Sequence, residues 1–277
     1  MKSNSVSYYL NNHEVIIKKP SHVKLYIVIG LFLLFFVFSL TFLELPRVLQ
    51  FNQLGAILSQ MVKPRDGKTY ADYFLFFIDS KLWGNVKDTL IICFIGTFFG
   101  GLLGLPIAIL TSRNIVKNKT TIYFIRVILT FLRSMPIAII AIIFVYILGI
   151  GTLHGILTVV LFTIGVLSKM LYEYIETLDM GSFEAIQSVG ANKLICTRNA
   201  TIPEIMPAYL GYLIYCFEMN FRASVIFGWV GAGGIGLFLS NAIDERYYDK
   251  AGVIIIIFMA ITISLQLLTR FVKGKIK

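Results

Sequence analysis

The chain has 277 residues, of which 57% are hydrophobic and 14% charged, and its mean hydropathy is +0.80. This composition excludes an ordinary soluble globule, because so few charged residues could not cover a water-facing surface. The net charge of +10 would suit nucleic-acid binding in a soluble protein, but here the cations gather at the ends of apolar runs. Anionic headgroups and the positive-inside bias account for them there, so we expect membrane lipid as the partner and no nucleic acid.

Six apolar stretches approach the length of about 20 residues that a membrane-spanning helix needs. They lie at residues 25–43, 88–111, 123–148, 153–170, 204–229 and 251–269. We therefore predict an all-α integral membrane protein with about six transmembrane helices. The first stretch follows a polar segment and has no small-residue cleavage site, so we expect a retained span and not a signal peptide.

Basic residues predict the orientation of these spans. They precede the first span, fill the second connection and follow the sixth span: Lys2, Lys18, Lys19, Lys24, Arg113, Lys117, Lys119, Arg270, Lys273, Lys275 and Lys277. In a six-span topology these three sites share one side, which the positive-inside rule makes cytoplasmic. We expect a bacterial plasma-membrane protein with both termini in the cytoplasm and the loop 44–87 outside.

The amino-acid composition changes along the chain and suggests regions with different functions. Residues 1–84 are Phe-rich and nearly free of Gly until Gly55, and we predict a cytoplasmic N-terminus, the first helix and the external loop there. Gly and Pro punctuate residues 85–270, the predicted transport core, and residues 271–277 form a basic cytoplasmic tail. Within the core, the small-residue spacing from Gly96 to Gly104 favours close helix packing over contact with a substrate.

Arg133 lies inside the third apolar stretch, where a charge costs roughly 2.5 to 3.5 kcal/mol on insertion scales at the span centre. It has no partner nearby in the sequence, which makes it a candidate for binding an anionic substrate. Pairing with Glu218 or Glu173 on another helix is the alternative. Pro136 interrupts the same stretch and is expected either to bend the helix near a pathway or to be a neutral kink.

A polar island lies between the fourth and fifth spans, on the side predicted to be cytoplasmic. Its characteristic residues are Glu184, Ala185, Gly190, Ala191 and Pro203. Gly allows the backbone to break between two short helices, and Pro is suited to start the next helix. A membrane subunit needs such a segment to present a short helix to a separate motor, although an ordinary amphipathic cytoplasmic helix is the alternative.

Glu218 and Arg222 lie four residues apart in the fifth span, on one helical face, so they can pair and lower each other's cost of burial. A pair that fixes helix packing is at least as well supported as direct contact with a substrate. Residues 231–236 then satisfy the dinucleotide-binding fingerprint with Gly at positions one, three and six. The context excludes that function, because the run follows an apolar span and is expected to precede an external loop, whereas the fingerprint needs a strand before it and a helix after it.

Several kinds of site have no sequence support. The three His residues are scattered singly and the three Cys residues lack metal-ligand spacing, so no metal and no disulfide are predicted. No phosphate-binding loop of the Gly-x4-Gly-Lys-Ser/Thr type is present. We therefore predict that the chain is not an enzyme, binds no cofactor itself, and depends on another polypeptide for ATP.

The region from Asn85 to the sixth span resembles the membrane subunit of a type I ATP-binding-cassette (ABC) importer, and the polar island marks that superfamily. Two further segments, 133–136 and 218–236, resemble its phosphonate-permease branch. The resemblance covers about two-thirds of the chain and leaves out the first 84 residues. The island departs from the common pattern at Ile186, where a second Ala is usual, and at Ala200, where a larger aliphatic residue is common.

The resemblance implies a type I permease core with a cytoplasmic coupling helix that enters a groove of an ATPase dimer. Glu184 would meet the motor, Ala185 would permit close approach and Gly190 would supply the bend. It further implies substrate-pathway and gate residues: Arg133, Pro136, Glu218, Asn220 and Arg222 for the pathway, and Gly231, Gly233, Gly234 and Gly236 for the gate. The expected partners are two ATPase subunits that carry ATP and Mg, a substrate-binding protein, and a second permease copy that forms a homodimer with this one.

The cargo implied is a phosphonate or a related phosphorus oxyanion moved by alternating access, with another small solute as the alternative. An ion-coupled secondary transporter is less well supported, because such proteins usually carry several acidic residues within their spans and often inverted repeats. Here Glu218 is the one clear mid-span acid, and no repeat is evident. A membrane enzyme would need a cluster of catalytic side chains that the sequence lacks.

Overall fold

The computed structural model describes residues 5–10, 13–18, 23–42, 51–63 and 70–276. The chain forms two compact units, Met1–Asn52 and Gln53–Lys277. The functional division that the sequence predicts at residue 84 stays a prediction. Lys2, Lys19 and Lys277, which contribute to the predicted orientation, lie outside the described residues.

The first unit holds a small hairpin and one apolar helix. Strand β1 (Ser5–Leu10) pairs antiparallel with β2 (His13–Lys18), with Ser5 opposite Lys18 and Leu10 opposite His13. The sequence analysis expected no strand, and this local hairpin is the exception to an otherwise helical fold. Helix α1 (Val23–Phe42) is apolar on all sides and matches the first predicted span closely.

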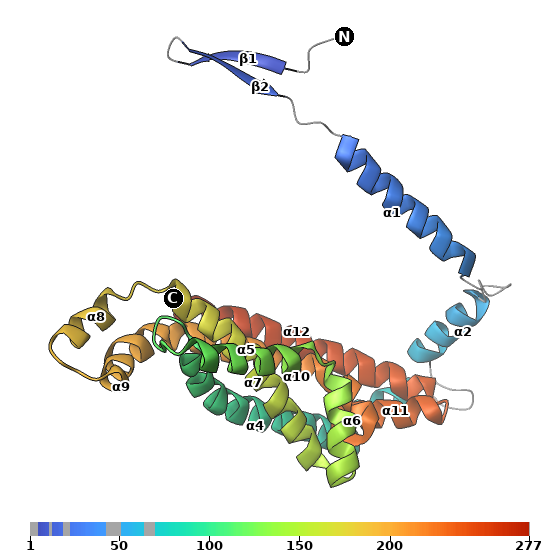
Figure 1. The fold of residues 1–277 in the computed structure, drawn as a ribbon. Helices are drawn as coiled ribbons and strands as arrows, with labels where there is room; N and C mark the ends of the chain where they lie inside the picture. The colour runs from blue at the N-terminus through green and yellow to red at the C-terminus, as the bar shows by residue number, and fades with distance from the viewer. Residues whose placement is uncertain (1–4, 11–12, 19–22, 43–50, 64–69, 277) are drawn as a thin grey trace. The chain divides into compact units, whose positions relative to one another are not determined.

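The second unit contains the remaining helices. They are α2 (Phe51–Val62), α3 (Tyr70–Phe76), α4 (Ser80–Thr111), α5 (Lys119–Ser134), α6 (Ile137–Leu148), α7 (Thr152–Thr177), α8 (Gly181–Ser188), α9 (Lys193–Cys196), α10 (Ile202–Phe227), α11 (Gly234–Asp244) and α12 (Tyr248–Ile276). Two short π-helical turns, η1 (Thr197–Thr201) and η2 (Gly228–Ala232), flank α10. Most of these helices form one elongated bundle, from which α8 and α9 project at one end (Figure 1).

Three segments of the described chain are long and apolar enough to cross a membrane as single helices, Phe74–Thr111, Thr152–Thr177 and Tyr248–Gly274. They contain the predicted spans 88–111, 153–170 and 251–269. Two bent helix pairs pass the same test, and Leu25–Leu40 is a shorter apolar helix. Together these segments account for the six predicted apolar stretches, and the chain is a multi-pass membrane protein.

The predicted apolar stretch at 123–148 is sharply bent, which is one of the two alternatives that the sequence leaves open for Pro136. Helices α5 and α6 meet at an angle of 93°. Pro136 is the N-cap of α6, and Met135 before it has an extended backbone with ψ 127°. The residue before a proline is driven out of the helical region by a clash with the ring, so the break falls at Met135.

Helices α4 and α7 make the most extensive packing in the bundle, and small residues permit it. A Cβ atom built on Gly96 would lie 2.6 Å from Cβ of Val159, and one built on Gly100 would lie 2.6 Å from Cβ of Thr163. Neither position has room for a side chain. The predicted role of this glycine spacing in close helix packing is therefore confirmed.

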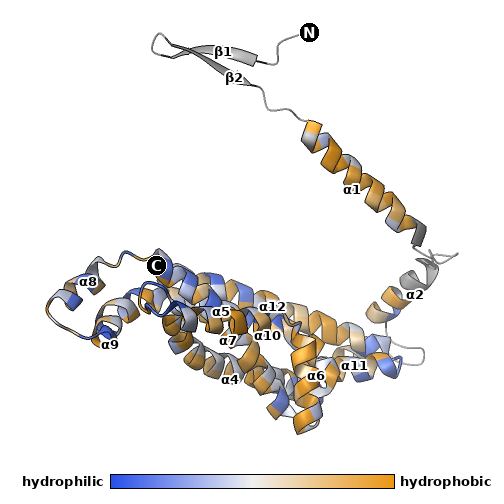
Figure 2. Ribbon diagram, in the orientation of Figure 1, coloured by the Kyte–Doolittle hydropathy of each residue, from blue (hydrophilic) through white to orange (hydrophobic). Residues whose placement is uncertain are grey.

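Many apolar side chains on the outside of the bundle are exposed. Figure 2 shows how strongly apolar the residues of α6 are. Phe94, Phe131 and Leu267 are each about 60% exposed, among many others. Such a surface needs lipid or another apolar partner to cover it.

Candidate functional site

The segment 181–201, which we call the projecting segment, extends from one end of the bundle (Figure 1). Helix α8 is followed by a turn in which Gly190 has φ +89°, and α9 then runs back toward the bundle. A left-handed backbone of this kind favours Gly, so Gly190 makes the bend between two short helices that the sequence predicts.

A small core holds the projecting segment together. Phe183 from α8 packs with Cys196 and Ala200 from the α9 side, and Ile186 and Ala191 border them. Both departures from the family pattern therefore lie in or against this core: Ile186 is half-buried and Ala200 is 8% exposed. The segment is thus a folded unit with its own apolar contacts.

The outer surface of the projecting segment combines a carboxylate with apolar side chains. Glu184 and Ala185 are exposed on α8, Val189 is 85% exposed beside the turn, and Leu194 is 75% exposed on α9. Large apolar side chains on a protruding surface of this kind indicate a protein-interaction site.

Pro203 lies in the first turn of α10, as the sequence predicts, but no helix break precedes it. Helix α10 is assigned from Ile202, but the backbone is already helical before it, and Lys193–Ala232 forms one continuous helical segment. The π-helical turn η1 precedes the proline, and the N–H of Ile202 bonds to the carbonyl of Thr197. The wider turn accommodates a residue that has no N–H to donate. Consequently the projecting segment and α10 share a rigid helical connection.

Helix α10 carries Asn220 into the centre of the bundle. Its amide nitrogen donates to the hydroxyl oxygens of Thr97 on α4, at 2.9 Å, and Thr163 on α7, at 2.8 Å. Asn220 is 0% exposed, and its Oδ1 has no hydrogen-bond partner among the described residues. In this conformation Asn220 joins three helices, and sequence reasoning did not identify the two threonines that bind it.

The predicted pairing of Glu218 with Arg222 is confirmed, with 3.2 Å between a carboxylate oxygen of Glu218 and a guanidinium nitrogen of Arg222. The Glu218 side chain is 9% exposed and that of Arg222 is 49% exposed. The other acid proposed as a partner for Arg133, Glu173, pairs instead with Lys169 at 3.3 Å. Within the described parts of the chain, both candidate partners of Arg133 are thus paired elsewhere.

Arg133 is exposed in the last turn of α5, directly before the break at Met135, and Pro136 is exposed beside it. The end of α5 packs on α7, because a Cβ atom on Gly165 would lie 3.5 Å from the backbone nitrogen of Arg133. Gly165 is two residues from Thr163, which binds Asn220. Arg133 and Asn220 therefore lie at a similar depth on different sides of α7, since two residues turn an α-helix by roughly 200°.

The glycine-rich run lies at the other end of α10. Gly231, Gly233 and Gly234 have φ values of +97°, +79° and +69°, and the chain turns by 67° into α11. The run thus precedes a helix and not, as expected, an external loop. Gly228 and Gly236 bring two backbone segments together, since a Cβ on Gly228 would lie 2.6 Å from Cα of Gly236.

One interhelical ion pair escaped the sequence analysis. Arg126 on α5 pairs with Glu176 at the end of α7, and it also donates to the carbonyl oxygen of Thr111 at 3.0 Å. From the sequence, we used charges near the ends of spans only to predict the orientation of the chain. Opposite charges at adjoining ends of neighbouring spans are the signal that could have found this pair.

Comparison with known proteins agrees with this arrangement. Residues 100–277 match the family described as the inner membrane component of binding-protein-dependent transport systems. The chain belongs to this family. Its fold is also similar to that of the inward-facing MetNI methionine ABC transporter, with a TM-score of 0.63 and 21% identity over 71% of this chain and 96% of that chain.

Two relatives are named for phosphorus oxyanions. The phosphate-import permease PhnE of Mycolicibacterium smegmatis is 35% identical over 217 residues, which are 78% of this chain and 39% of that protein. The cryptic phosphonate transport permease PhnE2 of Escherichia coli, itself described with a putative assignment, is 39% identical over 103 residues, 37% of this chain and 84% of that protein. The chain spans well under two thirds of the length of the first of these relatives.

Proposed function

We propose that the chain is the membrane-spanning permease subunit of an ABC importer that moves a phosphonate or related phosphorus oxyanion by alternating access. One observation carries the proposal. From Lys193 onward, the projecting segment continues without a helix break into α10, which carries Glu218, Asn220 and Arg222 through the bundle. Glu184 lies on the outer surface of α8, across the turn at Gly190 from this continuous helix.

The continuous helix suggests how ATP would drive transport. The chain itself would bind no nucleotide, and ATP and Mg would reside on two ATPase subunits. Glu184 and Ala185 would dock in a groove of the ATPase dimer, with the exposed Val189 and Leu194 beside them. Closure of the dimer would then favour one orientation of α10 over the other through its different contacts with the projecting segment.

The names of the relatives and the intramembrane cations support the choice of cargo. Phosphate, phosphonate and phosphite share a tetrahedral anionic head, and a guanidinium can bind two of its oxygens at once. Arg133 is exposed at the α5–α6 corner, and Arg222 is half-exposed beside Glu218. Either cation can bind an oxyanion in the pathway. Arg222 would have to give up its ion pair with Glu218 to do so.

The glycine-rich run would serve as the gate at the opposite end of α10 from the projecting segment. Its backbone turns sharply at Gly231, Gly233 and Gly234, where a side chain would restrict bending. The end of the bundle with the projecting segment also gathers Arg113, Lys117, Lys119, Lys193 and Arg198. This charge supports a cytoplasmic location for that end of the bundle.

The assembly that we propose contains a second copy of the chain, two ATPases and a substrate-binding protein. One chain supplies one projecting segment, whereas an ATPase dimer offers two grooves. The exposed apolar faces of the bundle supply surface for the second copy as well as for lipid.

Uptake of labelled aminoethylphosphonate by the native cells tests the proposal. We expect uptake to vanish when the chain is deleted, when Glu184→Arg is introduced, and when the cells are depleted of ATP. Glu245→Arg reverses an equally exposed carboxylate next to α11 and serves as the matched control, for which uptake should persist.

Three outcomes have distinct meanings. Unchanged uptake in the deletion would remove phosphonate as the main cargo, and phosphite and phosphate esters would be tested next. Uptake that survives ATP depletion but stops when ion gradients collapse would support the secondary transporter instead. Normal transport with Glu184→Arg would exclude the docking role of the projecting segment.

A further inference from the structure

A cation-rich pocket lies at the end of the bundle that carries the projecting segment, where α4 ends and α5 begins. It has a volume of about 590 Å³. Arg113, Lys117, Lys119 and Arg126 contribute its charged lining. It is separate from the glycine-rich run and from the Asn220 contacts, which lie elsewhere along the bundle.

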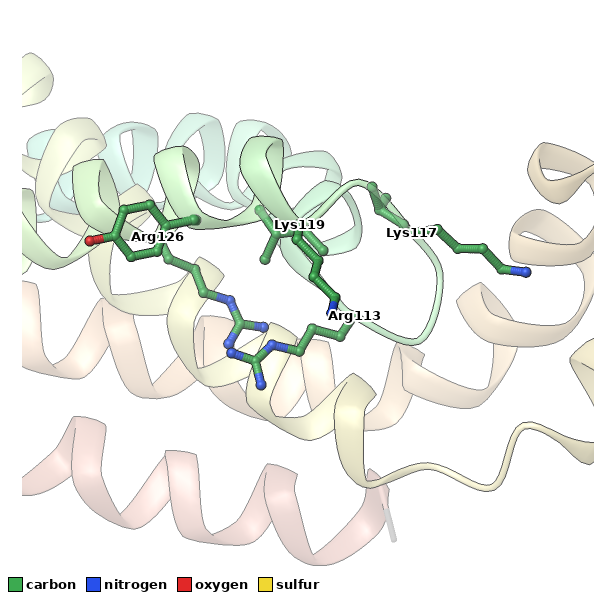
Figure 3. Close-up of a pocket in the computed structure, with 7 residues that line it drawn as sticks. Arg113, Lys117, Lys119 and Arg126 are labelled. Carbon is green, nitrogen blue, oxygen red and sulfur yellow. The ribbon is translucent and has the colours of Figure 1, made fainter.

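Figure 3 shows that the guanidinium groups of Arg113 and Arg126 point toward one another, with Lys119 extending toward Arg113, whereas Lys117 points away. Like charges held together in this way repel one another. The arrangement is therefore suited to an anion that several cations bind at once.

Arg126 is held in place by the protein. It pairs with Glu176, donates to the carbonyl oxygen of Thr111 at 3.0 Å, and lies with Cζ 4.4 Å from the ring centroid of Tyr172. Its buried Nε has no hydrogen-bond partner among the described residues. Its guanidinium is thus oriented in advance, which lowers the entropy lost when a ligand binds.

The acidic groups around the pocket do not balance its cations. Glu176 accepts from Arg126 and also from the backbone N–H of Arg113, at 2.8 Å. Glu173, one turn away on α7, pairs with Lys169. Among the described residues, no carboxylate pairs with the side chain of Arg113 or Lys119, so the pocket keeps a positive excess.

The rest of the lining is apolar, from Val116, Ile122 and Tyr123. Tyr123 is 74% exposed, and Phe124 and Val127 extend the exposed apolar surface along α5. A second cavity of about 750 Å³ shares Val116 and Lys117 and continues over apolar side chains of α4 such as Ile109. A ligand that fits both features has an anionic head and hydrocarbon chains.

We propose that this pocket binds the phosphate of an anionic phospholipid such as phosphatidylglycerol. The headgroup phosphate accepts from Arg113, Lys119 and Arg126, and the acyl chains lie along the apolar face of α5. Basic pockets between spans on the cytoplasmic side are suited to such headgroups. The site goes beyond the transport function and would hold for any cargo.

Native mass spectrometry of the full chain, co-purified with its ATPase in lipid-depleted micelles, tests the proposal by titration with phosphatidylglycerol. The test variant is Arg113→Gln/Lys119→Gln, which leaves the bonds of Arg126 intact. The matched control, Lys87→Gln/Arg270→Gln, removes two exposed cations outside both cavities. Phosphatidylcholine reports binding that does not depend on headgroup charge.

We expect the affinity of one bound phosphatidylglycerol to fall roughly 25-fold in the test variant, because each basic side chain near an anionic headgroup contributes about fivefold. The control should keep that lipid, and phosphatidylcholine should not occupy the site. Arg113→Lys/Lys119→Arg, which keeps both charges, should retain most of the affinity and guards against a folding defect.

Two results would overturn the proposal. An equal loss in the test and control variants would mean that only overall charge attracts the lipid. Displacement of the lipid by millimolar inorganic phosphate, or binding of phosphate with no preference for the lipid, would assign the pocket to a soluble oxyanion.

Discussion

The two ends of α10 are built in opposite ways. At the end toward the projecting segment, the helical backbone continues from Lys193 through the π-helical turn and past Pro203. At the other end, Gly231 leaves the helical region and the chain turns by 67° into α11. One end is therefore a continuous helical connection, and the other is a sharp turn of the backbone.

The presence of a proline does not by itself decide whether a helix breaks, as a comparison of Pro203 with Pro136 shows. Pro136 separates α5 from α6, whereas Pro203 lies within a continuous helix. Before Pro136 the backbone is extended at Met135, but before Pro203 it is helical at Ile202, with φ −60° and ψ −48°. The widened turn before Pro203 explains why the same residue type breaks one helix and not the other.

We expect the largest effect on uptake from a variant that makes the helical connection between the projecting segment and α10 more flexible. In the variant Arg198→Gly/Asn199→Gly, two exposed residues of the π-helical turn become flexible, at a cost of about 1 kcal/mol each in helix stability. We expect phosphonate uptake to fall about tenfold or more while the chain still assembles with its ATPase. Arg198→Ala/Asn199→Ala changes the same side chains but keeps helix propensity, so its uptake should stay near wild type. Equal uptake in both variants would show that the rigid connection is not needed.

A second test addresses the glycine end through stability. A Cβ on Gly236 would lie 2.7 Å from the carbonyl oxygen of Val225, whereas Gly211, inside α10, has open space around it. Gly236→Ala should destabilise the chain by about 1 to 3 kcal/mol through overpacking. Gly211→Ala should stabilise it by roughly 0.5 to 1 kcal/mol through helix propensity. Thermal unfolding of the purified chain measures both, and shifts of the same sign would contradict the packing argument.

How much of this structure the sequence predicts depends on how far apart the interacting residues lie along the chain. The apolar stretches, the glycine spacing on α4, the bend at Gly190 and the Glu218–Arg222 pair depend on residues close together in the chain, and each was predicted. The break at Met135 and the continuity at Pro203 depend on how neighbouring turns adjust. The Asn220 contacts join residues 57 and 123 positions apart, which only helix packing brings together.

The Asn220 contacts are expected to contribute less than the glycine packing. Thr97→Val and Thr163→Val each remove one hydroxyl acceptor with little change in shape. Hydrogen bonds between spans average about 0.6 kcal/mol each, so the double variant should lose about 1 kcal/mol of unfolding free energy. Thr262→Val is the matched control, because that hydroxyl bonds within its own helix to the carbonyl oxygen of Phe258. If Thr262→Val lowers the free energy of unfolding as much as the double variant does, that result would contradict a specific role for Asn220.

The smallest change in stability should come from Glu218→Gln, which releases the half-exposed Arg222 at the centre of α10. A pair with one solvent-exposed partner contributes only about 0.5 kcal/mol, so unfolding should hardly change. If Arg222 binds the oxyanion, its release should lower the KM of phosphonate uptake about fivefold, since one more charge-assisted hydrogen bond becomes available. Glu173→Gln frees Lys169 from the comparable pair on α7 and should leave KM unchanged. A KM that stays constant in both variants would make the Glu218–Arg222 pair a packing feature, and Arg133 would then be the remaining cation in the proposed pathway.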